Sequence, residues 1–347
     1  MDSAELGALI AALDGRTVAV IGDVVADEFV YGRVARVSRE APVLILEYDS
    51  TEIVPGGAGN AGNNVAALGG RAALVSIIGR DDAGRRMLTA LHPRVDSTAV
   101  TRAPKIGTVI KTRILAGGVH SAKQQVVRID RGVGQHLDAE VRARFERAAL
   151  DVLSGADAVL MSDYGAGLVT PALARRIAGE LRRARHPIPV LIDSRHRLLE
   201  YRGLTACTPN ESEVEYALGV RINDNGRTLE SAGREILKRT GMKAVLITRG
   251  SRGMALFVPG AQTVHIPIHG SDEIADVTGA GDTVVATMTL ALSAGATFEA
   301  AARLANYAGG LVVMKRGTAT VSAAELRAAV GLSRRRENGK GNAKADG

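Results

Sequence analysis

The chain has 347 residues, of which 46% are hydrophobic and 23% are charged, so it is long enough to bury a large core. It has no tryptophan and only 3% aromatic residues, which argues against a single-stranded nucleic-acid binder that stacks bases on aromatic rings. The single Cys207 excludes an intramolecular disulfide and a cysteine metal cluster. The net charge of +7 suits an anionic small substrate, although a solvated basic surface explains it equally well.

The two ends of the chain carry no targeting signal that we recognise. Residues 1–13 form a mild amphipathic helix with acidic side chains, which is unlike a signal peptide. No window reaches ~18 uncharged apolar residues, so we expect a cytoplasmic protein without membrane contact. Residues 333–347 are basic and have no apolar face, which predicts a disordered tail after a folded domain spanning residues 1–332.

Short apolar runs alternate with helical patterns along most of the chain. Strands are expected at residues 18–21, 73–78, 158–161, 190–192, 244–247, 254–258 and 264–268. Helices are expected at residues 60–68, 83–91, 138–153, 171–184, 211–218, 229–240, 282–294, 298–314 and 323–330. Continuous apolar strands between helices predict an α/β fold, with a mostly parallel central sheet covered by helices on both faces.

Two segments break this alternation. Residues 24–48 and 105–131 are rich in β-forming patterns and contain no good helix. Four short strands from these two segments can pair into a small sheet that stands off the main one. We call this predicted sheet the lid, because it can close over a ligand, and its exposed edges can also pack against a second copy of the chain.

Polar residues follow nearly every predicted strand of the main sheet. Asp23, Asp163, Asp193, Asn210 and Thr248 all lie at such strand ends. In open α/β sheets, ligands bind beyond the carboxyl ends of the strands. Ordinary loop chemistry also favours these residue types, but their repetition indicates a site at this edge.

The segment from Asp276 to Thr283 is the most informative motif. Gly279, Ala280 and Gly281 lead into a buried helix, whose free N–H groups and dipole suit a phosphate. Asp282 lies beside that site, where it can accept a proton from a hydroxyl that attacks the phosphate, although helix capping is the simpler explanation. No P-loop pattern occurs, which excludes a P-loop kinase.

Gly57, Gly59 and Gly62 fit the G-x-G-x-x-G fingerprint of dinucleotide-binding proteins, with Asp81 about twenty residues further on. The fingerprint requires a strand that runs directly into its first glycine. A polar stretch at residues 49–52 and a proline intervene here, so an NAD-dependent oxidoreductase is a remote alternative.

A sugar pocket explains this glycine-rich segment better. Gly56 and Gly57 let the backbone approach a polyhydroxy ligand closely, and Asn60 offers both a donor and an acceptor. Asp23 can accept hydrogen bonds from sugar hydroxyls.

Together, Gly56-Gly57 with Asn60 and the segment from Asp276 to Thr283 resemble the two signatures of the ribokinase-like (PfkB) sugar kinases. The resemblance covers about residues 18–330. Residues 22–24, 36–43, 108–113 and 124–130 resemble more narrowly the branch that phosphorylates D-glycero-β-D-manno-heptose 7-phosphate. That branch implies a 1,7-bisphosphate product for ADP-heptose and lipopolysaccharide core synthesis, and the chain is similar to its stand-alone kinase form.

The resemblance implies a role for each matching residue. Asp282 would be the base, and Gly279, Ala280 and Gly281 the anion hole. The implied sugar ligands are Asp23, Gly56, Gly57 and Asn60, with Lys111, Arg113 and Arg128 of the lid as candidates for the substrate phosphate. The implied nucleotide ligands are Asn210, Glu213, Thr248, Gly250, Gly253 and Asn306.

ATP, Mg²⁺ and a homodimer formed through the lid are the implied cofactors and partner. Glu213 would help place Mg²⁺ indirectly, and Asp276 would bind K⁺, organise the loop or merely cap it. The branch usually has Asp-Pro-Lys where this chain has Asp193-Ser194-Arg195, which leaves the exact sugar open. The alternatives are another ribokinase-like sugar or nucleoside kinase and a non-catalytic sugar-binding protein.

Overall fold

The computed structural model describes residues 3–117, 123–132, 137–185, 187–223, 225–270 and 276–331. The tail predicted for residues 333–347 lies outside the described residues. Within the described part, no helix is both long and apolar enough to cross a membrane.

A nine-stranded sheet runs through the main body in the order β15-β14-β13-β12-β11-β10-β1-β4-β6. Its strands are β1 (Thr17–Gly22), β4 (Arg71–Val75), β6 (Val95–Asp96), β10 (Ala158–Asp163), β11 (Val190–Ser194), β12 (Ala206–Cys207), β13 (Ala244–Thr248), β14 (Met254–Phe257) and β15 (Val264–Ile266). All neighbouring pairs are parallel except β13–β14 and β14–β15, which are antiparallel. The mostly parallel sheet is therefore confirmed.

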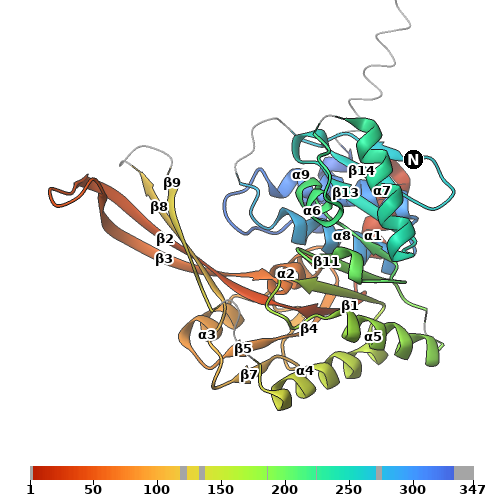
Figure 1. Ribbon diagram of the computed structural model, residues 1–347, viewed down its shortest axis with the longest axis horizontal. Helices are drawn as coiled ribbons and strands as arrows, with labels where there is room; N and C mark the ends of the chain where they lie inside the picture. The colour runs from red at the N-terminus through yellow and green to blue at the C-terminus, as the bar shows by residue number, and fades with distance from the viewer. Residues whose placement is uncertain are drawn as a thin grey trace, which may run out of the picture.

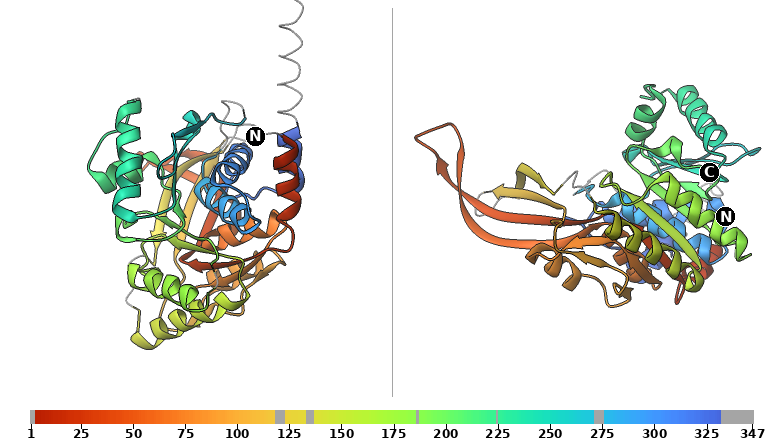
Figure 2. Two further views of the ribbon diagram at one scale, coloured as in Figure 1. Left: turned by 90° about the vertical axis from the view of Figure 1, so that its right-hand side faces the viewer. Right: turned by 60° about the horizontal axis from the view of Figure 1, so that its bottom comes forward.

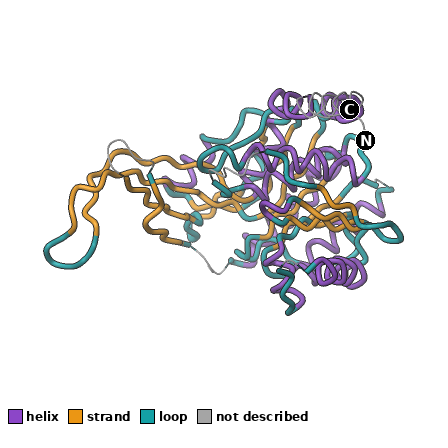
Figure 3. The backbone as a smooth tube through the Cα atoms, turned by 90° about the horizontal axis from the view of Figure 1, so that it is seen from above, coloured by secondary structure: helices purple, strands orange, loops and turns teal. Residues whose placement is uncertain are grey.

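Helices cover both faces of this sheet, as the views in Figure 2 and Figure 3 show. Successive strand residues point to opposite faces, so Val20 and Leu160 join one core while Ile21 and Met161 join the other. The first core includes residues of α1 (Ser3–Ala12), α2 (Ala58–Ala67), α3 (Asp82–Thr89), α8 (Ala280–Ser293) and α9 (Phe298–Val312). The second includes residues of α4 (Ala139–Asp151), α5 (Pro171–Arg183), α6 (Glu211–Leu218) and α7 (Gly226–Thr240).

The lid is a separate four-stranded sheet in the order β3-β2-β8-β9. It consists of β2 (Val24–Val37), β3 (Leu44–Gly57), β8 (Ile110–Gly117) and β9 (Gln124–Arg131). Figure 1 shows it as a long arm that projects from the main body. The small predicted sheet is thus confirmed, and β3 extends well beyond the predicted end of the first segment at residue 48.

The polar stretch at residues 49–52 belongs to β3, which leads directly into α2. The expectation that this polar stretch separates a strand from the first glycine of the fingerprint is therefore wrong. β3 nevertheless pairs antiparallel with β2 in the lid, so it is not the first parallel strand of a βαβ unit. The context that a dinucleotide site requires is absent for this reason.

The other expected elements mostly match the observed ones. The apolar run at residues 73–78 is split between β4 and β5 (Ile77–Gly79), and β5 pairs with β7 (Thr101–Ala103) in a two-stranded sheet. Strands β6 and β12 were not expected, because two residues each carry no periodic pattern. Residues 323–331 are helical, as expected.

Candidate active site

The start of α8 lies at the edge where the parallel strands end, beside the base of the lid. Gly279 caps the helix with a φ of 78°, and a Cβ atom at this position would lie 2.5 Å from Nδ2 of Asn60. Glycine is therefore required both for the left-handed backbone and for the close approach of α2. Among the described residues, a Cβ atom on Gly281 would have no atom within 4 Å, so they leave the start of the helix open on that side. The N–H groups of a first helical turn lack intrahelical acceptors, which leaves them for an anion.

Asp282 is 2% exposed, and both of its carboxylate oxygens accept hydrogen bonds. Nδ2 of Asn60 donates to Oδ2 at 2.9 Å, and the phenol of Tyr164 donates to Oδ1 at 2.9 Å. Burial raises the pKa of Asp282 to about 6, while the two hydrogen bonds oppose that rise. A base with a pKa near neutrality suits proton transfer at physiological pH.

Asn60 is held in place by a network between α2 and α8. Nδ2 of Asn64 donates to Oδ1 of Asn60 at 3.1 Å, and the hydroxyl of Thr283 donates to Oδ1 of Asn64 at 3.1 Å. These side chains are fully or almost fully buried, so the network is shielded from water. It fixes the amide of Asn60 that faces the predicted base.

Asp23 follows β1 and is 1% exposed. Its Oδ2 accepts the backbone N–H groups of Tyr164 at 2.9 Å and Ala166 at 3.0 Å. Its Oδ1 is buried without a hydrogen-bond partner among the described residues. Burial, reinforced by repulsion from Asp163, raises the pKa of Asp23 to about 6. A buried oxygen without a donor fits a ligand hydroxyl, which agrees with the predicted sugar contact.

Gly56 and Gly57 are also required by the packing of β2 against β3. A Cβ atom on Gly56 would lie 2.2 Å from Oδ2 of Asp27, and one on Gly57 would lie 2.4 Å from the carbonyl oxygen of Asp23. Close backbone packing therefore explains Gly57 without a ligand, whereas the nearest neighbour of Gly56 is a side-chain carboxylate. Contact of either glycine with a sugar stays a prediction.

The three predicted lid cations have different surroundings. Arg113 forms an ion pair with buried Asp27 at 2.5 Å, and Arg128 pairs with Asp130 at 2.6 Å. Lys111 is 9% exposed and makes no ion pair among the described residues, and its Nζ lies 4.9 Å from the ring centroid of Tyr164. Burial lowers the pKa of Lys111, and repulsion from Arg195 adds to this effect.

Two residues at this site were not assigned a role from the sequence. The ring of Tyr164 lies under the guanidinium of Arg195, with Cζ 4.7 Å from the ring centroid. Both residues stand at strand ends that the sequence marked as polar, but no motif distinguished them from ordinary loop residues. Their position next to Asp282 and Lys111 becomes visible only in the fold.

Three of the residues predicted to bind the nucleotide line one open pocket of about 430 Å³: Asn210, Thr248 and Gly250. Asn210 and Thr248 also form a parallel β-bridge. Gly253 and Asn306 do not line this pocket. A Cβ atom on Gly253 would lie 2.1 Å from the carbonyl oxygen of Ile266, and Asn306 donates to the carbonyl of Pro267 at 2.9 Å.

Glu213 caps helix α6 and also lies close to a second carboxylate, that of Asp193. Its side chain accepts the N–H of Asn210 at 2.9 Å in a capping box that starts α6. Burial raises its pKa, and burial together with repulsion from Glu213 and Asp282 raises the pKa of Asp193 well above its ordinary value. Two neighbouring carboxylates that resist ionisation fit a hard cation such as Mg²⁺.

The described residues contain no group of three or more histidine, cysteine or acidic side chains that could hold a metal by themselves. Mg²⁺ is commonly held by one or two carboxylates together with substrate phosphates, and Asp193 and Glu213 would fit that ligand type. Asp276 accepts the N–H groups of Thr278 at 2.9 Å and Gly317 at 3.0 Å. It therefore organises its loop in this structure, and its binding of K⁺ stays a prediction.

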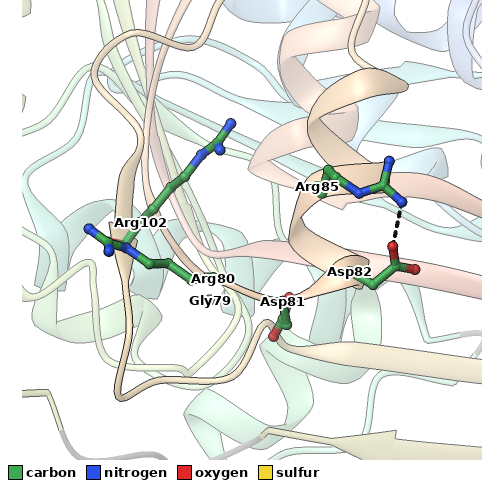
Figure 4. A pocket seen from close by; sticks show the side chains of 6 residues that line it. All are labelled: Gly79, Arg80, Asp81, Asp82, Arg85 and Arg102. Carbon is green, nitrogen blue, oxygen red and sulfur yellow. Dashed lines mark hydrogen bonds and ion pairs between the residues drawn. The ribbon is translucent and has the colours of Figure 1, made fainter.

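A second hollow, of about 690 Å³, lies at the end of β5 (Figure 4). It is lined by Gly79, Arg80, Asp81, Asp82, Arg85 and Arg102. Arg85 pairs with Asp82 at 2.5 Å, and Asp81 caps α3 and accepts from Thr108 at the entrance to the lid. None of the residues that the sequence assigned to catalysis or binding lines this hollow.

The family model described as pfkB family carbohydrate kinase matches residues 16–325. The chain is 40% identical to bifunctional protein HldE of Trichlorobacter lovleyi over 323 residues, which cover 92% of this chain and 64% of that protein. It is 42% identical to bifunctional protein HldE of Caulobacter vibrioides over 336 residues, covering 94% and 66% respectively. The chain thus spans about two thirds of the length of these relatives.

Solved structures show the same fold at low sequence identity. Arabidopsis thaliana ribokinase complexed with ribose and ATP gives a TM-score of 0.68 at 19% identity, covering 91% of this chain and 99% of that one. Phosphofructokinase-2 from Escherichia coli in complex with substrates and products gives 0.72 at 19% identity, covering 92% and 99%. The ribokinase-like fold is therefore confirmed, and the chain belongs to the pfkB family of carbohydrate kinases.

Proposed function

We propose that this carbohydrate kinase transfers the γ-phosphate of ATP to a phosphorylated sugar. The sugar proposed is D-glycero-β-D-manno-heptose 7-phosphate, and the product its 1,7-bisphosphate, for ADP-heptose and lipopolysaccharide core synthesis. The observation that carries the proposal is the buried Asp282 at the start of α8, close to the lid cation Lys111, which forms no ion pair with the residues that the structure describes. The motifs shared with the heptose 7-phosphate branch support this sugar, and relatives named bifunctional are consistent with a branch that also occurs fused to a second enzyme.

The proposed mechanism consists of positioning and charge stabilisation. The anomeric hydroxyl attacks the γ-phosphorus of ATP while Asp282 accepts its proton, the bond to the β,γ-bridging oxygen breaks, and ADP leaves. The N–H groups at the start of α8 stabilise charge on the phosphoryl oxygens. Asp23 and Asn60 orient the sugar. Asp193 and Glu213 would hold Mg²⁺, which when bound neutralises charge on the nucleotide phosphates.

A substrate panel tests the proposed sugar. With ATP, we expect kcat/KM for heptose 7-phosphate to exceed that for ribose, fructose and fructose 6-phosphate by about 100-fold or more, because the site recognises both the ring and a remote phosphate. Phosphorus NMR should show a new anomeric phosphate. A preference for another sugar would favour the alternative ribokinase-like kinases, and binding without transfer would favour a non-catalytic protein.

Replacing the base separates chemistry from binding. Asp282→Asn should lower kcat by about 10²- to 10⁴-fold, while the Kd for ATP measured by calorimetry stays within about twofold. Asp96→Asn, at an exposed position on β6, is the matched control. In the unmodified enzyme, kcat should fall as the pH drops below about 6, because the protonated carboxyl of Asp282 cannot accept a proton. Near-normal turnover by Asp282→Asn would exclude this role.

Lys111 is the lid cation best placed to recognise the substrate phosphate. Lys111→Gln should raise KM for the phosphorylated sugar by about tenfold or more and leave KM for ATP nearly unchanged, because one charge-assisted contact is lost. Lys123→Gln is the control, since Lys123 lies in the same lid but pairs with Asp49. Equal effects of both substitutions would point to a general effect of lid charge.

Dimerisation through the lid is the proposed assembly. Most of the large hydrophobic side chains that stay exposed lie in the lid, among them Val127 and Ile129 of β9, which is exposed along its whole length. Light scattering should therefore give twice the mass of the chain. Val127→Lys combined with Ile129→Lys should give monomers, and Tyr216→Lys, at an exposed position outside the lid, should remain a dimer.

A further inference from the structure

We propose that Tyr164 is a positioning residue for catalysis, which orients the Asp282 carboxylate and couples it to the sugar-binding Asp23. This inference rests on the proposed function, in which Asp282 is the base. Tyr164 belongs to no motif that the sequence resemblance identified, and its role follows from contacts made by its side chain and its backbone together.

Tyr164 bridges two buried carboxylates. Its phenol donates to Oδ1 of Asp282 at 2.9 Å, and its backbone N–H donates to Oδ2 of Asp23 at 2.9 Å. Both carboxylates are almost completely buried, so each depends on protein donors rather than on water. Movement of this one residue therefore changes the hydrogen bonding of the sugar ligand and of the base at once.

The phenol determines how Asp282 is oriented. A carboxylate has two oxygens with about four acceptor positions, and Asn60 and Tyr164 occupy one position on each oxygen. Donors on both oxygens fix the rotation of the carboxylate about the Cβ–Cγ bond. Without such donors, this torsion angle has a broad distribution. Without the phenol, Oδ1 would have no hydrogen-bond donor among the described residues, and the carboxylate could turn away from the sugar hydroxyl.

The phenol stays a donor because its own ionisation is suppressed. Burial, together with the charge of Asp282, holds the pKa of Tyr164 well above its ordinary value. The ring is also fixed by two cations: Nζ of Lys111 lies 4.9 Å and Cζ of Arg195 lies 4.7 Å from its centroid. A neutral, immobilised phenol is a suitable donor for orienting a carboxylate.

The groups around Asp282 show in which direction its pKa should change when the Tyr164 hydroxyl is removed. Asp27 of β2 and Asp193 of β11 repel its negative charge, and Lys111 of β8 attracts it. Arg195 lies over the ring of Tyr164 and repels Lys111. The hydrogen bonds from Asn60 and Tyr164 both favour the ionised carboxylate, so removing either one should make Asp282 harder to ionise.

The loop that carries Tyr164 is anchored independently of the base. Asp163 accepts hydrogen bonds from the hydroxyls of Ser194 at 2.8 Å and Tyr201 at 2.7 Å. Ala166 adds a second N–H to Asp23 at 3.0 Å. Loss of the Tyr164 hydroxyl should therefore leave the loop in place.

The decisive test is Tyr164→Phe, assayed with ATP and heptose 7-phosphate, or with the best sugar of the panel, across pH 5 to 9. We expect the midpoint of the acid limb of kcat to rise by about one pH unit, because a hydrogen bond that favours the ionised base is lost. We expect kcat at pH 7.5 to fall about 10- to 100-fold and KM for ATP to stay unchanged. Tyr216→Phe, at an exposed position outside the site, is the control and should leave both kcat and the acid limb where they are.

A graded substitution tests the hydrogen bond without removing it. Site-specific 3-fluorotyrosine at position 164 has a more acidic phenol, which donates more strongly. The acid limb should then shift downward, in the direction opposite to that of Tyr164→Phe. An acid limb that is unchanged in both variants would overturn the inference.

Failure of this inference can be told apart from failure of the proposed function. ¹³C NMR of aspartate-labelled protein follows the titration of Asp282 without turnover, with its signal assigned by Asp282→Asn. If Asp282→Asn retains turnover, Asp282 is not the base and the proposed mechanism fails. If Asp282→Asn is inactive but Tyr164→Phe leaves the titration, the acid limb and kcat unchanged, only the role of Tyr164 is lost.

Discussion

The structure of the site depends on one constraint, the burial of the Asp282 carboxylate. Burying a charge without partners is costly, so the fold must supply donors to it. One donor, Asn60, lies 222 residues away in the sequence, and the other, Tyr164, lies 118 residues away. Helix α2, helix α8 and the loop after β10 must therefore meet at one point.

Glycine makes this meeting possible. Gly279 lets Asn60 approach the start of α8, and Gly57 lets the backbone pass close to the carbonyl of Asp23. Both glycines also have a positive φ, which other residues adopt only with strain. The glycine motifs of this chain therefore serve close packing around the two carboxylates before any ligand is present.

The main features of the fold could be predicted from the sequence because they depend on local pattern. Apolar runs marked most of the longer strands, and the glycine-rich turn before a buried helix marked Asp282. The middle of β3 was missed because a lid strand that is exposed on much of its length shows no apolar alternation. The two-residue strands β6 and β12 were missed because they are defined by pairing alone.

The surroundings of individual site residues could not be predicted, because they depend on contacts between distant segments. From the sequence alone, Lys111, Arg113 and Arg128 were equally good candidates for lid cations that bind the substrate phosphate. The fold pairs Arg113 with Asp27 and Arg128 with Asp130, and leaves Lys111 facing Tyr164. Glu213 likewise matched a nucleotide motif, and the fold shows that the same residue completes a capping box.

The three arginines of β8 and β9 differ from Lys111 in how their charge is balanced. Arg113, Arg128 and Arg131 are each matched by a carboxylate within the lid. A paired cation offers little net field at a distance, whereas the ammonium of Lys111 is buried and its charge is not cancelled by an ion pair among the described residues. Arg195 of the main body lies on the ring of Tyr164, as Lys111 does. Two cations, one from the lid and one from the main body, therefore meet at Tyr164 beside Asp282, and an anionic sugar held between them would bring the two parts together.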